Sequence, residues 1–336
     1  MGANSRAELA PAGVSLRKEI TMTQMAATRD AYGTTLVELG EQNPAVVVLD
    51  ADLSGSTKTA LFAKKFPERF FNMGIAEANM VGTAAGLAAA GKIPFVSTFA
   101  IFAAGRAWEQ IRQSVAYPKA NVKIVPTHGG ITVGEDGASH QSVEDIAIMR
   151  AIPNMTVIVP ADAVETAAAV RAVAAFRGPV YLRLGRNKVS TIFDDSYRFE
   201  IGKGKVLMEG TDLTFVTTGL MTAQALIAAE RLQKEGISAR VLHMATVKPL
   251  DGDLLLDAAL ETGAIVTAEE HSIVGGLGGA VAEFLAEQAP TPLVRVGIND
   301  RFGTSGKAEE LLKYFGLTHE DLEEAARRVL ERKVRR

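Results

Sequence analysis

Short apolar runs recur along the first half of the chain, separated by longer segments with helical patterning. The run at 44–49, Pro-Ala-Val-Val-Val-Leu, is continuous, as is typical of a parallel strand buried on both faces. Gly40 is expected to end the first helix. The alternation predicts a doubly wound α/β domain over residues 21–190. Its predicted strands are 44–49, 92–98, 122–126, 155–159 and 180–184, and its predicted helices are 21–40, 76–90, 103–116, 142–150 and 163–175.

The alternation restarts after a more polar connector, which we interpret as a linker at residues 191–205. It predicts a second doubly wound α/β domain over residues 206–330. Residues 1–20 are interpreted as a flexible leader and residues 331–336 as a basic tail. The elements expected in the second domain are strands at 213–217, 238–244 and 264–268, helices at 222–235 and from the glycine run 275–279 to Glu287, and a turn at 246–251.

Length and composition narrow the class of protein. The 336 residues suit two domains at ~100–200 residues each. A net charge of −3 gives no reason to expect a nucleic acid or an anionic membrane as partner. The chain has no cysteine, which excludes disulfides, thiol nucleophiles and Cys-ligated metal sites, and we expect a cytoplasmic location. No apolar run approaches the ~18 residues of a membrane span.

The predicted helix at 76–90 consists almost wholly of small and apolar residues, a pattern that predicts burial on nearly all sides. Glu77 lies in its first turn, although a glutamate is seldom buried unless something pairs with it. Two interpretations remain open from the residues alone. Glu77 is either a functional carboxylate or a first-turn acid that the helix dipole favours.

The densest polar cluster, at 127–141, directly follows a predicted buried strand. It holds His128 and His140, the pair Glu135-Asp136, and the four glycines Gly129, Gly130, Gly134 and Gly137. Histidine suits proton transfer near neutral pH, and glycine lets the backbone approach a ligand closely. A glycine-rich turn with incidental histidines is the alternative. The histidine spacing does not match that of a zinc site.

Two other features of the sequence suggest ligands less strongly. The polar turn at 50–57 follows a predicted strand, at the edge of the sheet where open α/β folds bind ligands. The glycine run at 275–279 lacks the order of a dinucleotide fingerprint, so we interpret it as a tight strand–helix turn. His271, after Glu269-Glu270, is expected to be a structural or interface residue rather than a catalytic one.

These motifs, taken in order, resemble the transketolase family over residues ~25–330. The matching segments are Met73–Met80, Ser97–Phe102, Thr127-His128, Gly134–Gln141, Ile158–Asp162 and Leu182–Arg186, similar to its pyrimidine-binding domain, and Val241–Leu250 and Thr267–Gly279, similar to its C-terminal domain. The family's Gly-Asp-Gly motif, followed about thirty residues later by an Asn, is missing from the chain. The resemblance therefore implies a fold with two doubly wound domains, namely a thiamine-diphosphate-binding fold of the pyrimidine type and a transketolase C-terminal-like domain. It also implies the C-terminal subunit of a split transketolase.

The resemblance implies thiamine diphosphate as cofactor, with Mg²⁺ or Ca²⁺ held by the partner subunit. Glu77 matches the glutamate that protonates N1′ of the aminopyrimidine and so activates C2. Phe99 and Phe102 match the aromatic residues that pack on the pyrimidine, while Gly105 stands where the family usually has a third aromatic residue. Two residues of the turn after a strand, Asp52 and Leu53, match positions that line the cofactor.

The resemblance also implies a site for a phosphorylated sugar. Arg29, Ser56 and Arg186 match the residues that hold the phosphate, for which a guanidinium fork is well suited. Asp136 matches the contact to a substrate hydroxyl. His128 and His140 match histidines that bind the substrate and help to move its protons, so the catalytic residues implied are Glu77, His128 and His140.

The implied activity is transfer of a two-carbon glycolaldehyde unit from a ketose phosphate to an aldose phosphate, as in the pentose phosphate pathway. The implied assembly is an α2β2 heterotetramer with the N-terminal, diphosphate-binding subunit. Alternatives within the enzyme class are a transketolase for an unusual sulfo- or branched sugar, a deoxyxylulose phosphate synthase and a 2-oxo acid dehydrogenase β subunit. A non-catalytic regulatory partner is the alternative from another class. The intact set Glu77, His128, Asp136 and His140 speaks against it.

Overall fold

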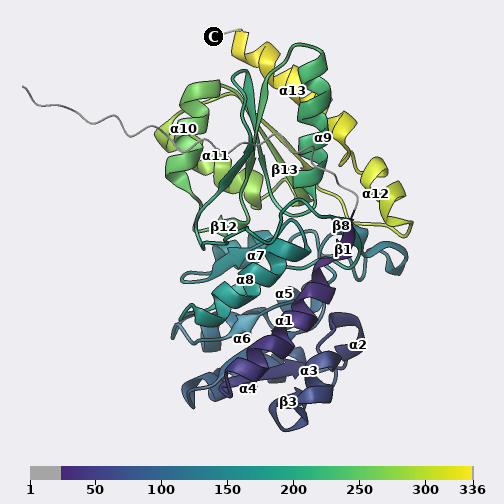
Figure 1. Cartoon of the computed structure of the whole chain (residues 1–336), viewed down its shortest axis with the longest axis vertical. Coiled ribbons are helices and arrows are strands. Elements are labelled where there is room, and N and C mark those ends of the chain that lie inside the picture. Colours follow the sequence, from purple (N-terminus) through teal and green to yellow (C-terminus); the bar gives the residue numbers. More distant parts are fainter. Residues whose placement is uncertain (1–23, 335–336) are drawn as a thin grey trace, which may run out of the picture.

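The computed structural model describes residues 24–334 of the chain. The predicted leader at 1–20 lies outside the described residues, as do residues 335–336 of the predicted tail. Two α/β domains, each built on a mostly parallel sheet, are stacked along the long axis of the molecule (Figure 1). This confirms the predicted fold class.

The first sheet has seven strands in the order β12-β6-β7-β5-β4-β2-β3, all parallel except β12. Buried apolar side chains fill the central strands, as the continuous runs in the sequence predict. The bounds are β2 (Val46–Asp50), β3 (Phe70–Asn72), β4 (Ile93–Ser97), β5 (Lys123–Ile124), β6 (Thr156–Ile158), β7 (Val180–Leu182) and β12 (Thr246–Lys248).

Helices cover both faces of this sheet. On one face, α1 (Thr28–Gln42) packs beside α8 (Ala163–Ala175) over a core around Tyr32, Phe95 and Val170. The other face carries α4 (Glu77–Ala89), α5 (Ala100–Arg106), α6 (Trp108–Gln110), a π-helical segment (Ile111–Ala116) and α7 (Asp145–Ala151). Shorter elements are α2 (Ser54–Thr57), α3 (Ala60–Lys65) and the 3₁₀ segments Pro67–Arg69 and Ile131–Asp136.

The second sheet has five strands in the order β14-β13-β10-β11-β9, with β9 antiparallel. Helices α9 and α13 pack together on one face, and α10 and α11 lie on the other (Figure 1). The bounds are β9 (Lys205–Met208), β10 (Leu213–Thr217), α9 (Met221–Lys234), β11 (Ala239–His243), α10 (Gly252–Thr262), β13 (Ile265–Ser272), α11 (Leu277–Gln288), β14 (Leu293–Ile298), α12 (Ala308–Tyr314) and α13 (His319–Val334). Residues 331–334 of the predicted tail are therefore the end of α13.

Two predictions about the ends of elements were wrong. Residues 25–27 form a short strand, β1 (Met25–Ala27), paired with β8 (Lys188–Ser190), so the first helix begins only at Thr28. That helix also continues past Gly40 to Gln42. A Cβ atom at position 40 would lie 2.6 Å from ring atoms of both Phe62 and Phe66. Gly40 is therefore needed for close packing rather than for helix termination.

The predicted burial of the helix at 76–90 was also wrong for most of its surface. In α4 only Glu77, Met80, Val81 and Ala84 are buried. Asn79, Gly82 and Gly86 are exposed, and a Cβ atom at either glycine would meet nothing within 4 Å. The pattern failed because small residues pack closely against either the core or another molecule, and the sequence does not distinguish the two.

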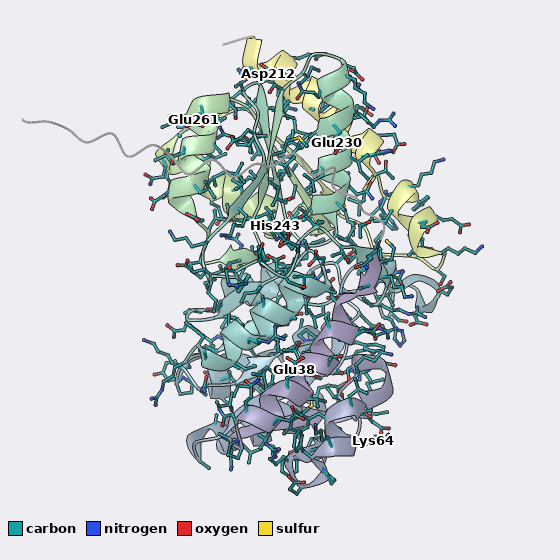
Figure 2. The ribbon with its side chains drawn as sticks, in the orientation of Figure 1. Glu38, Lys64, Asp212, Glu230, His243 and Glu261 are labelled. Atoms are coloured by element: carbon teal, nitrogen blue, oxygen red, sulfur yellow. The ribbon has the colours of Figure 1, made fainter. Side chains whose placement is uncertain are left out.

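The two domains share a strand and a polar junction. Residues 246–248, predicted to lie in a turn, form β12 and pair with β6 of the first domain. At the boundary, His243 (labelled in Figure 2) lies with its Nε2 2.7 Å from Glu165 of α8. Arg183 of the first domain also donates to the main-chain oxygen of Glu270 in β13, at 3.1 Å. These contacts and the shared sheet bind the domains into one packed body.

Candidate active site

The candidate site lies at the carboxyl ends of the parallel strands of the first sheet, where open α/β folds bind ligands. Asp52 follows β2, Phe99 follows β4, His128 follows β5 and Arg186 follows β7. Main-chain hydrogen bonds tie these strand ends together, including Ala100 N to the oxygen of Thr127 at 2.8 Å. The topology thus brings residues separated by more than a hundred positions to one edge of the sheet.

Glu77 opens α4 and is only 4% exposed. Its Oε1 accepts a hydrogen bond from Nη1 of Arg106, the last residue of α5, at 2.9 Å. The same guanidinium lies over the ring of Phe102, with Cζ 4.0 Å from the ring centre. Arg106 is the partner that a buried glutamate requires. Sequence analysis missed it, although it directly follows Gly105.

An aromatic wall stands beside this carboxylate. The rings of Phe99 and Phe102 are nearly parallel, at 15° with centres 5.7 Å apart. His128 stacks on Phe99 at 3.8 Å between centres, and His140 meets Phe102 edge-on at 5.4 Å. Gly105, where the family usually has an aromatic residue, is exposed with no atom within 4 Å of a Cβ placed there. The wall is therefore open on that side.

His128 is buried and has a left-handed backbone, with φ of 61°. Non-glycine residues seldom adopt this backbone conformation. Those that do are often found at functional sites. Nδ1 of His128 lies 2.7 Å from Oγ1 of Thr127. Burial lowers the pKa of His128 to about 3, and the nearby charges of Arg29 and Arg186 act in the same direction. The imidazole is therefore neutral near pH 7 and serves as a hydrogen-bonding group rather than a cation.

Two guanidinium groups lie near His128. Arg29 of α1 donates from Nη1 to the main-chain oxygen of Ser56 at 2.9 Å. Burial lowers the pKa of Arg29, and Arg186 lies close enough to lower it further. Nη1 of Arg186 lies 3.6 Å from Glu135 and 3.8 Å from Asp136, and donates to the main-chain oxygen of Val133. Two cations held near each other are a favourable place for an anion.

A buried carboxylate that sequence analysis missed supports the turn after β2. Oδ1 of Asp50 accepts from the main-chain nitrogen of Leu53 at 2.6 Å, and its Oδ2 accepts from the hydroxyls of Thr57 and Thr59. Burial raises the pKa of Asp50. Asp52, with φ of 64°, accepts from Nδ2 of Asn72 at 2.9 Å. The two candidate cofactor positions in this turn, Asp52 and Leu53, are thereby fixed in place.

The wall fits the pyrimidine half of a thiamine cofactor. Arg106 already shows that the surface formed by Phe102 and Glu77 accepts a flat group that donates a hydrogen bond to the carboxylate. An aminopyrimidine is likewise flat, and its N1′ can share a proton with this carboxylate. Among residues 24–334, no group of three or more His, Asp or Glu side chains is placed to hold a metal ion, and no helix is both long and apolar enough to cross a bilayer.

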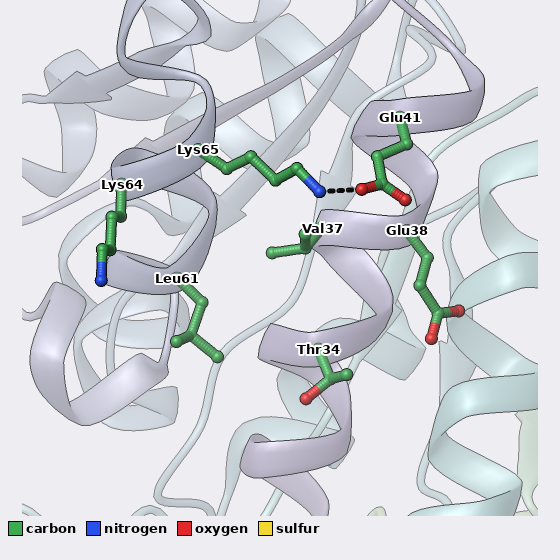
Figure 3. Close-up of a pocket in the computed structure, with 7 residues that line it drawn as sticks. All are labelled: Thr34, Val37, Glu38, Glu41, Leu61, Lys64 and Lys65. Atoms are coloured by element: carbon green, nitrogen blue, oxygen red, sulfur yellow. Dashed lines mark hydrogen bonds and ion pairs between the residues drawn. The ribbon is translucent and has the colours of Figure 1, made fainter.

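A separate cavity of about 590 Å³ lies between α1 and α3 (Figure 3). Its polar rim includes the ion pair of Lys65 with Glu41, and Glu38 on the same rim pairs with Arg171 at 2.6 Å. None of the candidate site residues lines it. The cavity therefore adds nothing to the site at the strand ends.

Comparisons with known proteins agree with this architecture. Residues 24–191 match the family model described as the transketolase pyrimidine binding domain, and residues 202–322 match the transketolase C-terminal domain. The chain is similar to the solved structure of a split gene transketolase described as an inactive beta4 tetramer, at 59% identity and a TM-score of 0.86, covering 91% of this chain and 98% of the other.

Two curated proteins extend the comparison. The chain is 47% identical to a 6-deoxy-6-sulfo-D-fructose transketolase subunit from Clostridium sp. (strain MSTE9), covering 91% of this chain and 95% of that protein. It is 39% identical to the transketolase of Homo sapiens, covering 90% of this chain but 48% of the human protein. The similarity therefore spans one relative nearly completely and the other over about half its length.

Proposed function

Because this chain belongs to the transketolase family, whose pyrimidine-binding and C-terminal domains it contains, we propose that it is the C-terminal subunit of a split transketolase. Transketolase domains imply the use of thiamine diphosphate and a transferase activity. The proposed reaction moves a two-carbon glycolaldehyde unit from a ketose phosphate to an aldose phosphate. We place the enzyme in the cytoplasm and in the pentose phosphate pathway.

One observation carries the proposal: His128 lies near two chemically different surfaces. One is the Phe99–Phe102 wall, on which His128 stacks, together with the carboxylate of Glu77, which is joined to Phe102 by Arg106. The other is formed by the guanidinium groups of Arg29 and Arg186, which lie close enough to lower the pKa of His128. A flat ring that shares a proton with a carboxylate fits the first surface, and a phosphate fits the second. A ketose phosphate joined to a thiamine cofactor needs both surfaces at once.

Each proposed residue has a distinct task. Thiamine diphosphate supplies, when bound, an acidic C2 that takes up and releases the two-carbon unit. Glu77 shares a proton with N1′ of the pyrimidine, while Phe99 and Phe102 pack against its ring. His128, being neutral, accepts or donates a hydrogen bond to the sugar without adding a positive charge. His140 and Asp136 bind substrate hydroxyls, and Arg29, Ser56 and Arg186 hold the phosphate.

A partner subunit is part of the proposal. The chain lacks the Gly-Asp-Gly and Asn motif that holds the diphosphate through Mg²⁺ or Ca²⁺. The exposed face of α4 and the open side at Gly105 leave the cofactor wall uncovered in the single chain. An N-terminal subunit that supplies the motif and covers this wall, in an α2β2 assembly, accounts for both observations.

A second substrate class has a specific observation in its favour. One close relative is described as a subunit acting with 6-deoxy-6-sulfo-D-fructose. A sulfonate is also a compact anion with several acceptor oxygens, so the Arg29–Arg186 pair suits it as well. Specificity between two such sugars depends on small changes in the pocket. Parallel assays with a sugar phosphate and its sulfo analogue rank the two candidates.

The central experiment compares the chain alone with the chain mixed with the N-terminal subunit. Both are assayed with thiamine diphosphate, Mg²⁺ and a ketose and aldose phosphate pair. We expect weak cofactor binding and no turnover from the chain alone, and turnover from the mixture, because the chain holds only the pyrimidine half of the cofactor site. Robust turnover by the isolated chain contradicts the proposed division between subunits.

A further inference from the structure

The glycine-rich loop after β5 packs against the second domain. A Cβ atom at Gly130 would lie 2.2 Å from the carboxylate of Glu270, and one at Gly137 would lie 2.4 Å from Oγ of Ser305. At Gly134 the nearest atom to such a Cβ is the main-chain oxygen of Gly306, at 3.4 Å. Three of the four glycines that the sequence singles out therefore face the C-terminal domain, and Gly134 also lies near Arg186, 3.7 Å from the position of such a Cβ.

Hydrogen bonds reinforce this contact. Oε1 of Glu270 accepts from the main-chain nitrogen of Thr132 at 2.7 Å. Nε2 of Gln141 lies within hydrogen-bond distance of the main-chain oxygens of Ile131 and Gly134 at 3.1 Å and of Thr304 at 2.9 Å. One amide thus joins the start and the middle of the 3₁₀ segment to the C-terminal domain. Such bonds fix the backbone of a loop that has no regular partner of its own.

Two adjacent glutamates of β13 hold different elements. Glu269 accepts from the main-chain nitrogens of Leu277 and Gly278, both at 2.7 Å, and so caps α11 within its own domain. Glu270 points to the opposite side of the strand, toward Thr132 of the first domain. Both carboxylates are buried, and burial raises the pKa of each. Their difference lies in which element each one stabilises.

Open space borders Glu270. A cavity of about 440 Å³ lies beside it, with Glu270, Arg183 and Thr132 in its lining. Arg183 cannot take over the role of Glu270, because a guanidinium only donates hydrogen bonds; its Nε lies 2.9 Å from Oδ2 of Asp145 and its Nη2 3.1 Å from the main-chain oxygen of Glu270. Loss of the Glu270 carboxylate removes the acceptor of the Thr132 nitrogen, and the loop loses this hydrogen bond.

We propose that Glu270 is a positioning residue for the substrate: through Thr132 it fixes the segment 131–136, which carries Asp136 and contacts Arg186. The C-terminal domain then sets substrate affinity without touching the substrate. Asp136 is the last residue of the segment, and Val133 within it accepts from Arg186. Movement at Thr132 therefore changes the places of both a hydroxyl-binding and a phosphate-binding group. This inference rests on the proposed function for its effect on the sugar, but not for its effect on the loop.

The test uses the full chain assembled with its N-terminal subunit and three variants. Glu270→Ala removes the acceptor, Glu270→Gln keeps an acceptor oxygen, and Glu269→Ala is the matched control. Hydrogen exchange of the peptide covering 131–137 reports on the loop, and KM and kcat with a sugar phosphate report on the site. Kd for thiamine diphosphate shows whether the cofactor side is intact.

For Glu270→Ala we expect faster exchange in 131–137 and a KM raised by about tenfold, with kcat and cofactor Kd within about threefold of the wild type. Glu270→Gln should keep both the exchange of 131–137 and KM close to the wild-type values. Glu269→Ala should lower Tm and leave the loop and KM unchanged. If Glu270→Ala does not assemble, Gln141→Leu removes the bridge to Thr304 and should give the same two effects.

Unchanged exchange in 131–137 for a folded Glu270→Ala protein overturns the positioning role. An equal rise of KM in Glu269→Ala also overturns it, because both effects then follow from lost stability alone. Faster loop exchange with an unchanged KM has a different meaning. In that case Glu270 does hold the loop through Thr132, but the loop does not position the substrate. The part that fails is then the substrate role of segment 131–136, which comes from the proposed function.

Discussion

The two sides of the candidate site, which we propose bind the substrate and the cofactor, are built differently. On the substrate side, the loop at 131–141 is held by Glu270 and Gln141, and its glycines pack against the second domain. On the cofactor side, Glu77 has one half-exposed partner, Arg106, and the wall ends at an exposed Gly105. The chain completes the first side from its own C-terminal domain. It leaves the second side open, as expected of a surface that another subunit covers.

The largest effect should come from the cofactor side. In the assembled enzyme, Glu77→Gln keeps a hydrogen bond but cannot exchange the proton, so activity should fall by ~10²–10⁴. Hydrogen–deuterium exchange at the cofactor's C2 and the Tm should be measured together. The control is Glu109→Gln, which changes an exposed carboxylate on α6. Near-normal C2 exchange in a folded Glu77→Gln protein would make Glu77 a first-turn acid, whose loss costs only ~0.3–1 kcal/mol.

A smaller effect should come from the phosphate pair on the substrate side. Arg29→Ala and Arg186→Ala should each raise KM for erythrose 4-phosphate more than for erythrose, because each loses a charge-assisted hydrogen bond worth roughly 1.5–3 kcal/mol. This corresponds to about tenfold to a hundredfold in KM. The matched control is Arg177→Ala, at an exposed arginine just after α8. An equal rise in KM for both sugars contradicts the assignment of Arg29 and Arg186 to the phosphate.

The smallest effect concerns His128, which stacks on Phe99 and lies near Arg29 and Arg186. Its pKa in the folded chain, about 3, is below the value of about 6.5 in an unfolded chain. Below pH 6.5 the unfolded state therefore binds more protons, and stability falls with decreasing pH. The loss due to His128 should be roughly 1.4 kcal/mol per pH unit between about pH 6 and pH 4.

Urea unfolding of the isolated chain at several pH values measures this slope. His128→Gln, which keeps a polar side chain but does not titrate, should have a shallower slope than the wild type by that amount. Identical slopes would mean that His128 is not held neutral in the folded protein.

The sequence predicted the two α/β domains because short continuous apolar runs and helical patterning are local signals. The strand at 44–49 and the helix at 163–175 correspond closely to β2 and α8. The resemblance implied one site from residues that follow different strands, and the structure places His128 and His140 beside Phe99. Their roles with cofactor and substrate remain predictions.

What the sequence could not predict depends on contacts between distant residues. Nothing local marks Arg106 as the partner of Glu77 or Glu270 as the partner of Thr132, which are 29 and 138 positions apart. Residues 246–248 were predicted to be a turn because a strand of three residues gives almost no periodic signal. The exposed face of α4 was missed because small residues suit a core and an intermolecular contact equally well.

The position of Trp108 gives the protein a built-in optical probe. It is the only tryptophan in the sequence, begins α6 two residues after Arg106, and is 38% exposed. Indole emission shifts with the polarity around the ring, and here one ring produces the entire signal. A subunit that covers this edge, or a ligand that displaces Arg106 from Phe102, changes the solvation of that ring. Unlabelled wild-type protein can therefore be titrated by fluorescence at the open edge of the cofactor wall.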